Sequence, residues 1–347
     1  MIKKNIYIRN EININEKRSP IVPYDICKLI NFGYKVWVQK SFHRIFTNEE
    51  YENNGAIITE LNWFDPKFKD FIIVGLKELD NLDKLNSHTH LYFSHSFQNQ
   101  LGSNNILNKF ANTNSRIIDF EYILGNNNKR IISFGYYAGL VGGGLGIVQY
   151  FLKQNNSKLS NLLCWNNIKI FYDFIEKNIN LNLIPDIKIC IIGSNGNTGI
   201  GVKYILNKYN FKFDCLYRNF NPIKLFDYDI IFNCIKLDEL YNNIWFDNSN
   251  IVNISKNFLI IDISCDVTKP NNPIKIYNSV TNWNNPVYSL NNYIDIISID
   301  NLPSLLPCES SINFSKQLIE LLKNNNSDYW SNCLEIYNDN IKNIKNI

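Results

Sequence analysis

Two side chains that could exchange protons with a substrate each follow an apolar run typical of a buried strand. Lys77 comes directly after "FIIVGL", with Glu78 beside it, and His95 lies in "LYFSHSF". Open α/β sheets place their sites at the carboxyl ends of such strands. A lysine there is either a solvated loop residue or a catalytic amine tuned by neighbouring carboxylates.

Further charged residues stand at comparable places along the first part of the chain. Glu121 lies in "IIDFEYI", Arg18 in "NEKRSPIVP" and Arg130 in "KRIISFG". Both arginines carry guanidinium groups next to the start of a strand or helix. Taken singly, each of these residues is more often structural or solvated than functional. Their combination indicates a site.

A glycine turn supplies the second chemical signal. In "IIGSNGNTGIGVKYIL" a short apolar run meets Gly193, Gly196 and Gly199 and leaves as a helix. In a dinucleotide site Gly193 would make the tight turn, Gly196 would let the backbone approach a pyrophosphate, and Gly199 would seat the helix on the strand. The same spacing also occurs in plain corners, so the turn by itself leaves both interpretations open.

The residue that would bind the cofactor ribose is not a carboxylate here. Asp214 has roughly the expected spacing but starts its strand, and the strand ends at Arg218 and Asn219. An amide can hydrogen-bond a ribose hydroxyl more weakly than a carboxylate. These residues therefore leave the 2′ position of the cofactor undecided.

The elements that must position these residues follow a β-α-β rhythm, which predicts parallel sheets covered by helices. The rhythm runs through residues 1–133. A helix over 134–154 opens a second unit, 134–307, in which the rhythm restarts. The many glycines of this helix suggest close packing where two domains meet. Residues 308–347 begin with an amphipathic helix. We therefore expect two Rossmann-like domains, 1–133 plus 308–347 for substrate and 134–307 for the dinucleotide, with the active site in the cleft between them.

Composition narrows the class of protein. A chain of 347 residues with 45% hydrophobic residues can bury two cores, and its net charge of +3 without a basic stripe argues against nucleic acid. Neither a secretion leader nor a membrane span is visible, so a cytoplasmic protein is expected. The 8 cysteines are scattered, which favours reduced, buried thiols over a metal site.

A family resemblance now becomes visible. "EKRSPIVP", "IIVGLKE", "FSHSF", "DFEYI", "RIISFGYYAG", the glycine turn, "DVTKPNNPIKIY" and "ISIDNLPSLLP" resemble, in order and spacing, the NAD-dependent saccharopine dehydrogenases that form L-lysine. The resemblance covers nearly the whole chain. It implies reversible oxidation of saccharopine to lysine and 2-oxoglutarate in α-aminoadipate-pathway lysine metabolism, by a monomer that uses NAD and needs no metal.

The same resemblance implies roles for individual residues. Lys77 looks like the base for the substrate amine, and His95 like the acid–base of the hydrolytic steps. The substrate carboxylates and chain would be held by Arg18, Arg130 and Phe134, and the acid–base pair would be tuned by Glu78 and Glu121. The cofactor contacts would be Gly193, Gly196, Asn197, Thr198, Gly199, Asn219, Ile263, Ile299, Asp300, Asn301 and Leu302.

Two residues depart from the family pattern, and two other functions stay open. Asn219 replaces the aspartate expected at the ribose, which puts the preference for NAD over NADP in question, and Cys308 replaces an arginine. One alternative is a related amino-acid or opine dehydrogenase similar to alanine dehydrogenase. The other is a catalytically silent dinucleotide-binding regulatory protein, which the intact Lys77 and His95 disfavour.

Overall fold

The computed structural model describes residues 4–97, 102–125, 129–180, 187–217, 220–237, 241–252, 254–324 and 328–345. The chain forms two compact units. Unit 1 comprises Met1–Ser133 and Pro307–Ile347, and unit 2 comprises Phe134–Leu306.

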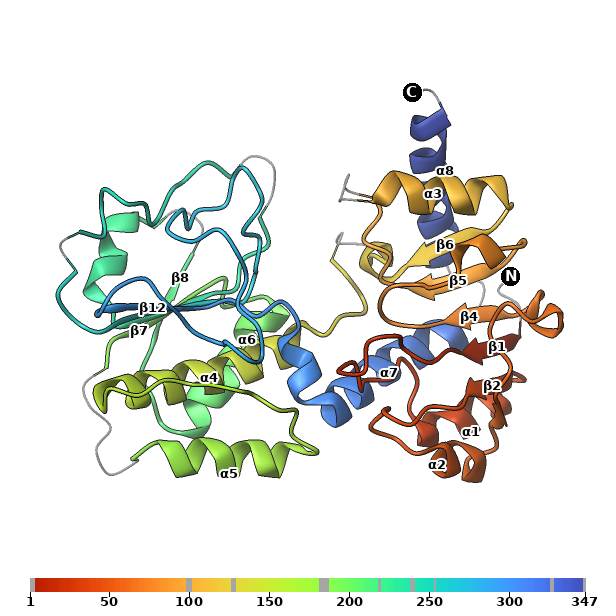
Figure 1. Cartoon of the computed structure of the whole chain (residues 1–347), viewed down its shortest axis with the longest axis horizontal. Helices are drawn as coiled ribbons and strands as arrows, with labels where there is room; N and C mark the ends of the chain where they lie inside the picture. The colour runs from red at the N-terminus through yellow and green to blue at the C-terminus, as the bar shows by residue number, and fades with distance from the viewer. Residues whose placement is uncertain are drawn as a thin grey trace. The chain divides into compact units, whose positions relative to one another are not determined.

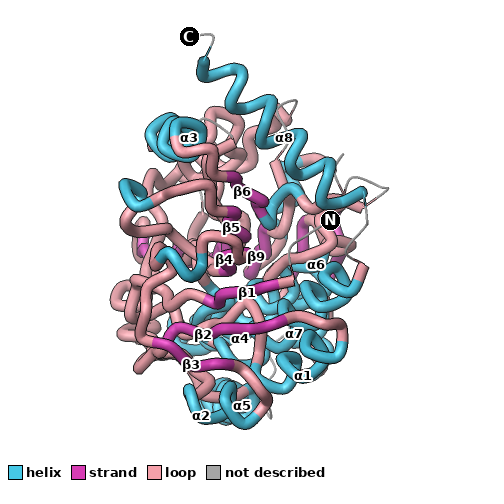
Figure 2. Tube along the Cα trace, turned by 90° about the vertical axis from the view of Figure 1, so that its right-hand side faces the viewer, coloured by secondary structure: helices cyan, strands magenta, loops and turns pink. Residues whose placement is uncertain are grey.

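Unit 1 is built on a fully parallel sheet with the strand order β3-β2-β1-β4-β5-β6, which Figure 2 shows as a ladder of magenta segments. Its strands are β1 (Asn5–Ile8), β2 (Lys35–Gln39), β3 (Ile57–Thr59), β4 (Ile72–Val74), β5 (Thr89–Tyr92) and β6 (Arg116–Asp119). The order reverses between β1 and β4. In open α/β sheets, ligands bind at the carboxyl ends of the strands beside such a reversal.

In the described part of unit 1, five helices accompany this sheet: α1 (Pro23–Asn31), α2 (Asn48–Asn53), α3 (Ser103–Asn112), α7 (Pro307–Lys323) and α8 (Asp328–Lys345). Two of them come from the segment that follows unit 2 in the chain. Helix α7 packs on α1, and Tyr34 Oη donates to the Leu322 carbonyl over 2.8 Å. Helix α8 packs on β6 and α3, and Tyr337 Oη donates to the Ser115 carbonyl over 2.7 Å. The sequence analysis anticipated a helix in the region of α7 but not α8.

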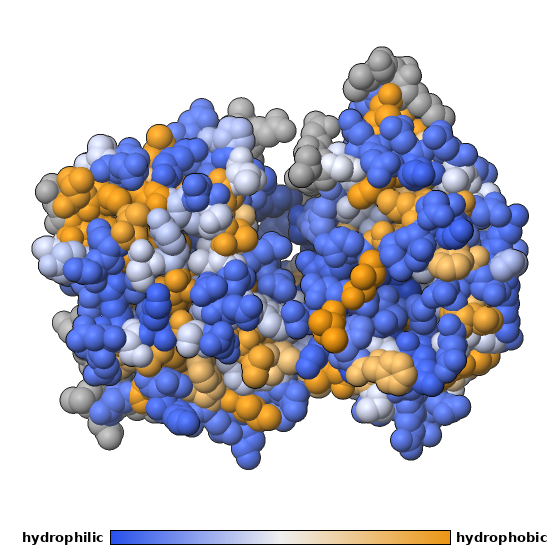
Figure 3. All heavy atoms as spheres, viewed as in Figure 1, coloured by the Kyte–Doolittle hydropathy of each residue, from blue (hydrophilic) through white to orange (hydrophobic). Residues whose placement is uncertain are grey.

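Short 3₁₀ turns make several connections in unit 1: η1 (Pro66–Phe68), η2 (Leu82–Lys84) and η3 (Phe120–Tyr122). Within the described residues, no helix combines the length and the apolar character needed to cross a membrane. On the face drawn in Figure 3, apolar residues are interspersed among hydrophilic ones.

Unit 2 contains a second sheet with the order β11-β12-β10-β9-β7-β8, parallel except for the edge strand β11. Figure 1 labels β7, β8 and β12 of this sheet. Its strands are β7 (Ile189–Ile192), β8 (Asp214–Leu216), β9 (Ile230–Asn233), β10 (Phe258–Asp262), β11 (Tyr288–Ser289) and β12 (Ile294–Ile297), and its helices are α4 (Gly135–Gln154), α5 (Ile168–Asn178) and α6 (Asn197–Lys208). The short turns are η5 (Pro222–Asp227) and η6 (Leu302–Leu305). The strand order reverses between β7 and β9.

The two faces of this sheet are covered differently, which the predicted β-α-β rhythm did not anticipate. Alternate residues of a strand point to opposite faces, so Ile191 joins the core under α4, α5 and α6, while Ile192 joins a second core. That second core contains Leu225 of η5 but is closed mainly by irregular chain, in which Trp245 and Phe246 are fully buried. Because these segments lack helical periodicity, the layer that they form could not be predicted from the sequence.

The glycines of α4 pack inside unit 2, which corrects the expectation that they mark a domain junction. A Cβ on Gly139 would lie 1.8 Å from the Thr198 carbonyl oxygen of α6, and one on Gly201 would lie 2.0 Å from the Tyr136 carbonyl oxygen. Gly143 and Gly144 face Ile205 of α6 and Phe171 of α5 in the same way. The missing side chains thus let the helices of unit 2 approach one another.

Candidate functional site

The glycine turn between β7 and α6 has a distinct geometry at each glycine. Gly193 has φ +85°, a left-handed conformation that closes the turn. A Cβ on Gly199 would lie 2.5 Å from the Gly193 carbonyl oxygen, so its absence seats the helix on the turn. A Cβ on Gly196 would meet only that same oxygen, at 3.6 Å. The backbone at Gly196 therefore has open space beside it, and no side chain caps α6 there.

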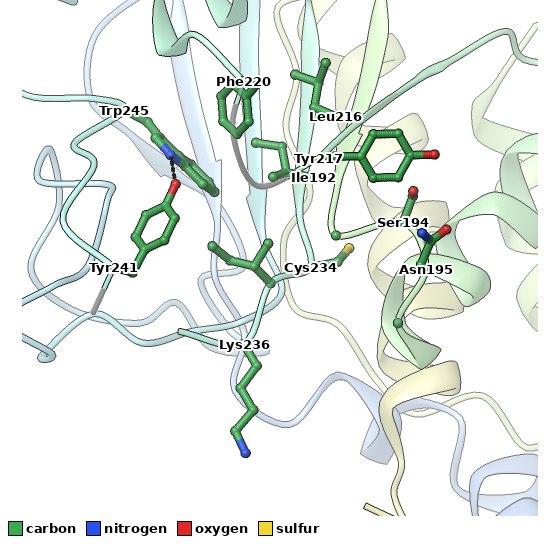
Figure 4. Close-up of a pocket in the computed structure, with 13 residues that line it drawn as sticks. Ile192, Ser194, Asn195, Leu216, Tyr217, Phe220, Cys234, Lys236, Tyr241 and Trp245 are labelled. Carbon is green, nitrogen blue, oxygen red and sulfur yellow. Dashed lines mark hydrogen bonds between the residues drawn. The ribbon is translucent and has the colours of Figure 1, made fainter. Parts of the chain in front are cut away.

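A cavity of about 290 Å³ opens next to this turn (Figure 4). The lining residues come from the turn, from the ends of β7, β8 and β9 and from irregular chain farther along: Ile192, Gly193, Ser194, Asn195, Gly196, Leu216, Tyr217, Phe220, Cys234, Ile235, Lys236, Tyr241 and Trp245. In Figure 4 the rings of Phe220, Tyr241 and Trp245 lie on one side of the cavity and the glycine turn on the other. Trp245 Nε1 donates to Tyr241 Oη over 2.6 Å, which holds the two rings together.

This cavity has the features that a dinucleotide requires. An aromatic wall suits a flat base, and the turn presents backbone N–H groups and the positive end of a helix. Ser194 is 1% exposed, and among the described residues its hydroxyl has no hydrogen-bond partner. A buried hydroxyl without a partner is costly unless a ligand supplies one. The residues of the cavity therefore fit a nucleotide with an anionic group near the turn.

The other predicted cofactor residues of unit 2 follow the carboxyl ends of the neighbouring strands. Ile263 comes after β10, and residues 299–302 come after β12. A Cβ on Gly142 of α4 would touch the side chains of both Ile263 and Leu302, so these two lie together. Asn197 and Thr198 are in the first turn of α6. Asn219 lies outside the described residues, and its role stays a prediction.

A buried polar cluster at the same sheet edge was missing from the sequence analysis. Asp262 at the end of β10 accepts a hydrogen bond of 2.8 Å from Asn233 Nδ2 and a close one from Tyr277 Oη. Tyr277 Oη and Ser298 Oγ lie 3.0 Å apart and share a further hydrogen bond. Burial raises the pKa of the Asp262 carboxyl against the lowering effect of these donors. The cluster ties the ends of β9, β10 and β12 together. Its members are far apart in the sequence and belong to no motif, so the cluster could not be predicted from the sequence.

In unit 1, the backbone of Lys77 is held by a buried ion pair. Glu11 accepts hydrogen bonds from the backbone N–H groups of Leu76, over 2.7 Å, and Lys77, over 2.9 Å. Arg9 donates to the Lys77 carbonyl and lies 3.3 Å from Glu11. Gly75 makes room for this arrangement, because a Cβ there would lie 2.1 Å from Arg9 Nε. The peptide of Lys77 is thereby fixed on both sides, while its half-buried side chain extends from the strand end.

The predicted carboxylate clamp Arg18 binds a carboxylate of its own chain. Its Nε and Nη2 donate to the two oxygens of Glu16 over 2.8 and 2.6 Å, and both residues are buried. Burial alone would raise the pKa of Glu16, but Arg18, together with the nearby Lys77, lowers it. Glu16 is thus a carboxylate beside Lys77 that the sequence analysis did not identify.

His95 lies in a short loop after β5, next to the loop that carries Lys77. The backbone N–H of Phe93 donates to the Leu76 carbonyl over 3.2 Å, which ties the two loops side by side. His95 is exposed and has φ +49°, a conformation that residues other than glycine adopt at some cost. The flanking Ser94 and Ser96 are buried. The imidazole is therefore turned outward at the same sheet edge as Lys77.

The remaining predicted residues of this site differ in their surroundings. Arg130 Nη2 lies 2.8 Å from Glu121 Oε1, a half-buried ion pair beyond the end of β6. Glu78, expected to tune the acid–base pair, is exposed. Phe134 stands just before α4 as its N-cap residue. Cys308 lies in the first turn of α7 and is half-buried.

Comparison with known proteins adds an independent finding. Residues 7–141 match the family model described as "Alanine dehydrogenase/PNT, N-terminal domain". The NAD(+), L-lysine-forming saccharopine dehydrogenase of Candida glabrata is 31% identical, over 96% of this chain and 96% of that protein. The enzyme of the same name from Schizosaccharomyces pombe is 30% identical, over 97% and 98%.

Solved structures support the fold. An L-alanine dehydrogenase superposes with a TM-score of 0.69 at 13% identity, covering 97% of this chain and 99% of that one. A transhydrogenase from Sinorhizobium meliloti gives a TM-score of 0.65 at 12% identity, covering 92% of each chain. The α/β fold with two mainly parallel sheets is thereby confirmed.

Proposed function

The chain belongs to the family of NAD(+)-dependent, L-lysine-forming saccharopine dehydrogenases, and from this membership we propose that it interconverts L-saccharopine with L-lysine and 2-oxoglutarate. The observation that carries the proposal is the match over nearly the full length of both chains. Lys77 and His95, which follow the adjacent parallel strands β4 and β5, support it. In the direction of lysine formation, saccharopine, NAD⁺ and water give lysine, 2-oxoglutarate, NADH and a proton.

The cofactor would be held by unit 2. The aromatic side of the cavity would take the adenine, and the Ser194 hydroxyl with the backbone of the glycine turn would donate to the diphosphate. When bound, NAD⁺ supplies the acceptor for the hydride that leaves the substrate carbon. The open space beside Gly196 lets the diphosphate approach the backbone closely.

The proton transfers would be carried out by unit 1. Lys77 takes the proton of the secondary amine as hydride leaves the adjacent carbon, which gives an imine. His95 removes a proton from the water that adds to the imine carbon, and returns it as the carbinolamine breaks into a ketone and an amine. Because the Glu11 and Arg9 contacts fix the peptide of Lys77, its side chain starts from a defined position.

Substrate carboxylates would be recognised by guanidinium groups. The guanidinium of Arg130, which is paired with Glu121, would bind one substrate carboxylate. Arg18 can bind another only if its ion pair with Glu16 breaks. Such an exchange strengthens selectivity for a ligand whose carboxylate fits better than Glu16 does. We further propose that the enzyme is a cytoplasmic monomer without a metal or a nucleic-acid partner.

Turnover with matched variants tests this function. Wild-type protein should oxidise NADH with lysine plus 2-oxoglutarate and much more slowly with pyruvate plus ammonia. Lys77→Met and His95→Gln should each lower kcat by about 10²–10⁴-fold, as removal of a positioned acid–base group does, and each should remove one limb of the bell-shaped pH profile of kcat/KM. Lys69→Met removes an exposed lysine of the same unit and should be neutral. Faster turnover with pyruvate would favour the alanine dehydrogenase-like alternative, and NADH binding without turnover would favour the silent binder.

A further inference from the structure

We propose that Asp119 is a positioning residue that fixes His95 for proton transfer and Glu121 for its pairing with Arg130, an inference that rests on the proposed function of His95. Asp119 ends β6, the strand next to β5, and its side chain is fully buried. Its carboxylate accepts from the backbone N–H of Glu121 and from Ser94, the residue before His95. Its effect runs through the hydrogen bonds that it accepts.

One oxygen of Asp119 holds the His95 loop. Oδ2 accepts from the backbone N–H of Ser94 over 3.0 Å and from Ser94 Oγ over 2.6 Å. Ser94 Oγ and Ser96 Oγ lie 2.7 Å apart and share a second hydrogen bond. The residues on both sides of His95 are therefore drawn inward toward the same carboxylate.

This inward pull explains the conformation of His95. With Ser94 and Ser96 buried and bonded to each other, the intervening residue must turn outward, and His95 does so with φ +49°. A left-handed conformation is unfavourable for a residue with a Cβ, so the surrounding contacts have to maintain it. The ring of Phe93 lies nearly parallel to the imidazole, with ring centroids 6.3 Å apart and an interplanar angle of 18°.

The other oxygen of Asp119 holds the segment that carries Glu121. Oδ1 accepts from the backbone N–H of Glu121 over 2.8 Å, at the start of η3. Glu121 in turn pairs with Arg130. Cys333 Sγ of α8 lies 3.4 Å from the Asp119 carbonyl oxygen, so the backbone at this position is also packed from behind. A single buried carboxylate thus connects the acid–base loop with the proposed carboxylate-binding pair.

The chemistry of a carboxylate explains why an amide cannot replace it. Asp119 uses both oxygens as acceptors for donors on two different segments. An asparagine has one acceptor oxygen and an NH₂ group, so it can satisfy either Ser94 or Glu121, and the NH₂ then faces a donor on the other side. The Asp119→Asn protein should therefore release one of the two segments while keeping nearly the same side-chain volume.

The experiment measures turnover, cofactor binding and local amide exchange in Asp119→Asn. We expect kcat with saccharopine to fall by about ten- to a hundredfold, as small misplacements of catalytic groups do, with the Kd for NADH within about twofold of wild type. Amide hydrogen exchange should rise in peptides covering residues 93–97 or 120–123. The matched control is Asp25→Asn, since Asp25 is a buried carboxylate of unit 1 that accepts from Ser315 Oγ over 2.5 Å. It should lower stability without lowering kcat.

A second variant covers the case in which Asp119→Asn fails to fold. Ser94→Ala keeps the backbone bond to Asp119 and removes both hydroxyl contacts, so kcat should fall by about fivefold, the effect expected for one to two hydrogen bonds. Unchanged kcat and unchanged exchange in the foldable variants would overturn the proposal. If the wild-type protein shows no saccharopine turnover while exchange still rises in the variants, the proposed function fails and the positioning role of Asp119 stands.

Discussion

Arg18 shows at the scale of a residue how a buried charge constrains the interpretation of a site. Its guanidinium, expected to receive a substrate carboxylate, is bound to Glu16, and both side chains are nearly excluded from water. A buried ion pair adds little net stability compared with apolar residues, but removing one partner leaves an uncompensated charge. The pair therefore makes a sharp prediction for stability that is separate from substrate binding.

Arg18→Ala should lower the free energy of unfolding by about 3–5 kcal/mol, because Glu16 is left buried without its partner. Arg18→Ala combined with Glu16→Gln should recover part of this loss, since no buried charge then remains in the pair. Urea unfolding of the two single variants and the double variant measures the coupling. Lys40→Ala, which opens the exposed pair with Glu60, should change stability little and serves as the control. Strictly additive losses would show that the two side chains do not interact.

His90 predicts how the stability of the protein depends on pH. It is fully buried among Trp63, Tyr92 and Phe110, and burial, reinforced by His88 and Arg9, holds its pKa well below 6.5. In the unfolded chain the imidazole takes up a proton below about pH 6.5, whereas the folded chain keeps it neutral, so stability falls as pH falls through that range.

The contribution of His90 to the slope of the unfolding free energy against pH approaches about 1.4 kcal/mol per pH unit. His90→Phe keeps an aromatic ring and removes the titration, so its stability should fall less steeply between pH 6.5 and pH 5 than that of wild type. Urea unfolding at several pH values measures the difference. Equal slopes in the two proteins would mean that His90 is protonated in the folded state.

At the scale of elements, the sequence was most informative where a local pattern coincides with a strand end. Apolar runs predicted β4, β5 and β7. The parallel strands β4 and β5 end at the same edge of their sheet, so the residues that follow them lie near each other. For this reason Lys77 and His95 could be selected together. The partners of these residues could not be found this way. Asp119 and Glu16 are ordinary acids in sequence, and only the fold brings them beside their donors.

The glycines of α4 show why the remaining errors arose. Their spacing revealed close packing but not the packing partner, because a glycine carries no information about what approaches it. In the structure, Gly139 admits the backbone of α6 at the end from which the glycine turn leads into that helix. The irregular cover over the second face of the unit 2 sheet escaped prediction because it has no period.

Gly139→Ala should disturb the glycine turn from a distance. The added Cβ meets backbone atoms of Thr198, which cannot rotate away, so α6 must shift. We expect a loss of about 1–3 kcal/mol in stability, typical of overpacking, and NADH binding weakened by at least about tenfold. The control is Gly144→Ala in the same helix, whose Cβ would meet the side-chain ends of Phe171 and Ile175 of unit 2, away from α6. Its NADH affinity, measured by fluorescence titration, should stay near wild type, and an equal loss in both variants would contradict the argument.

At the scale of the whole molecule, unit 1 is assembled from two segments separated by all of unit 2. Helix α7 supplies Ser311 and Ser315, whose hydroxyls accept from the backbone N–H groups of Ser19 and Val22 over 2.8 and 3.1 Å. Helix α8 covers β6. The buried faces of this sheet therefore depend on residues that lie far along the chain.

Removal of residues 307–345 should unfold unit 1 selectively. The deletion exposes the apolar surface under α7 and α8 and leaves several buried polar groups without partners. Unit 2 keeps its own two cores, so it should retain protected amides and NADH binding. Hydrogen exchange of the truncated protein, read separately for peptides of each unit, measures this. Continued protection of β1, β4 and β5 would show that α7 and α8 are dispensable for unit 1.

The divided construction of unit 1 has a consequence for the order of events on the ribosome. Unit 2 is one continuous segment and can begin to fold once residue 306 has left the exit tunnel. The six strands of unit 1 emerge before it, but they must wait until α7 and α8 have been synthesised. During that interval the apolar strands of the first 133 residues are exposed to aggregation, so a nascent chain stalled near residue 300 should recruit chaperones to the segment that was translated first.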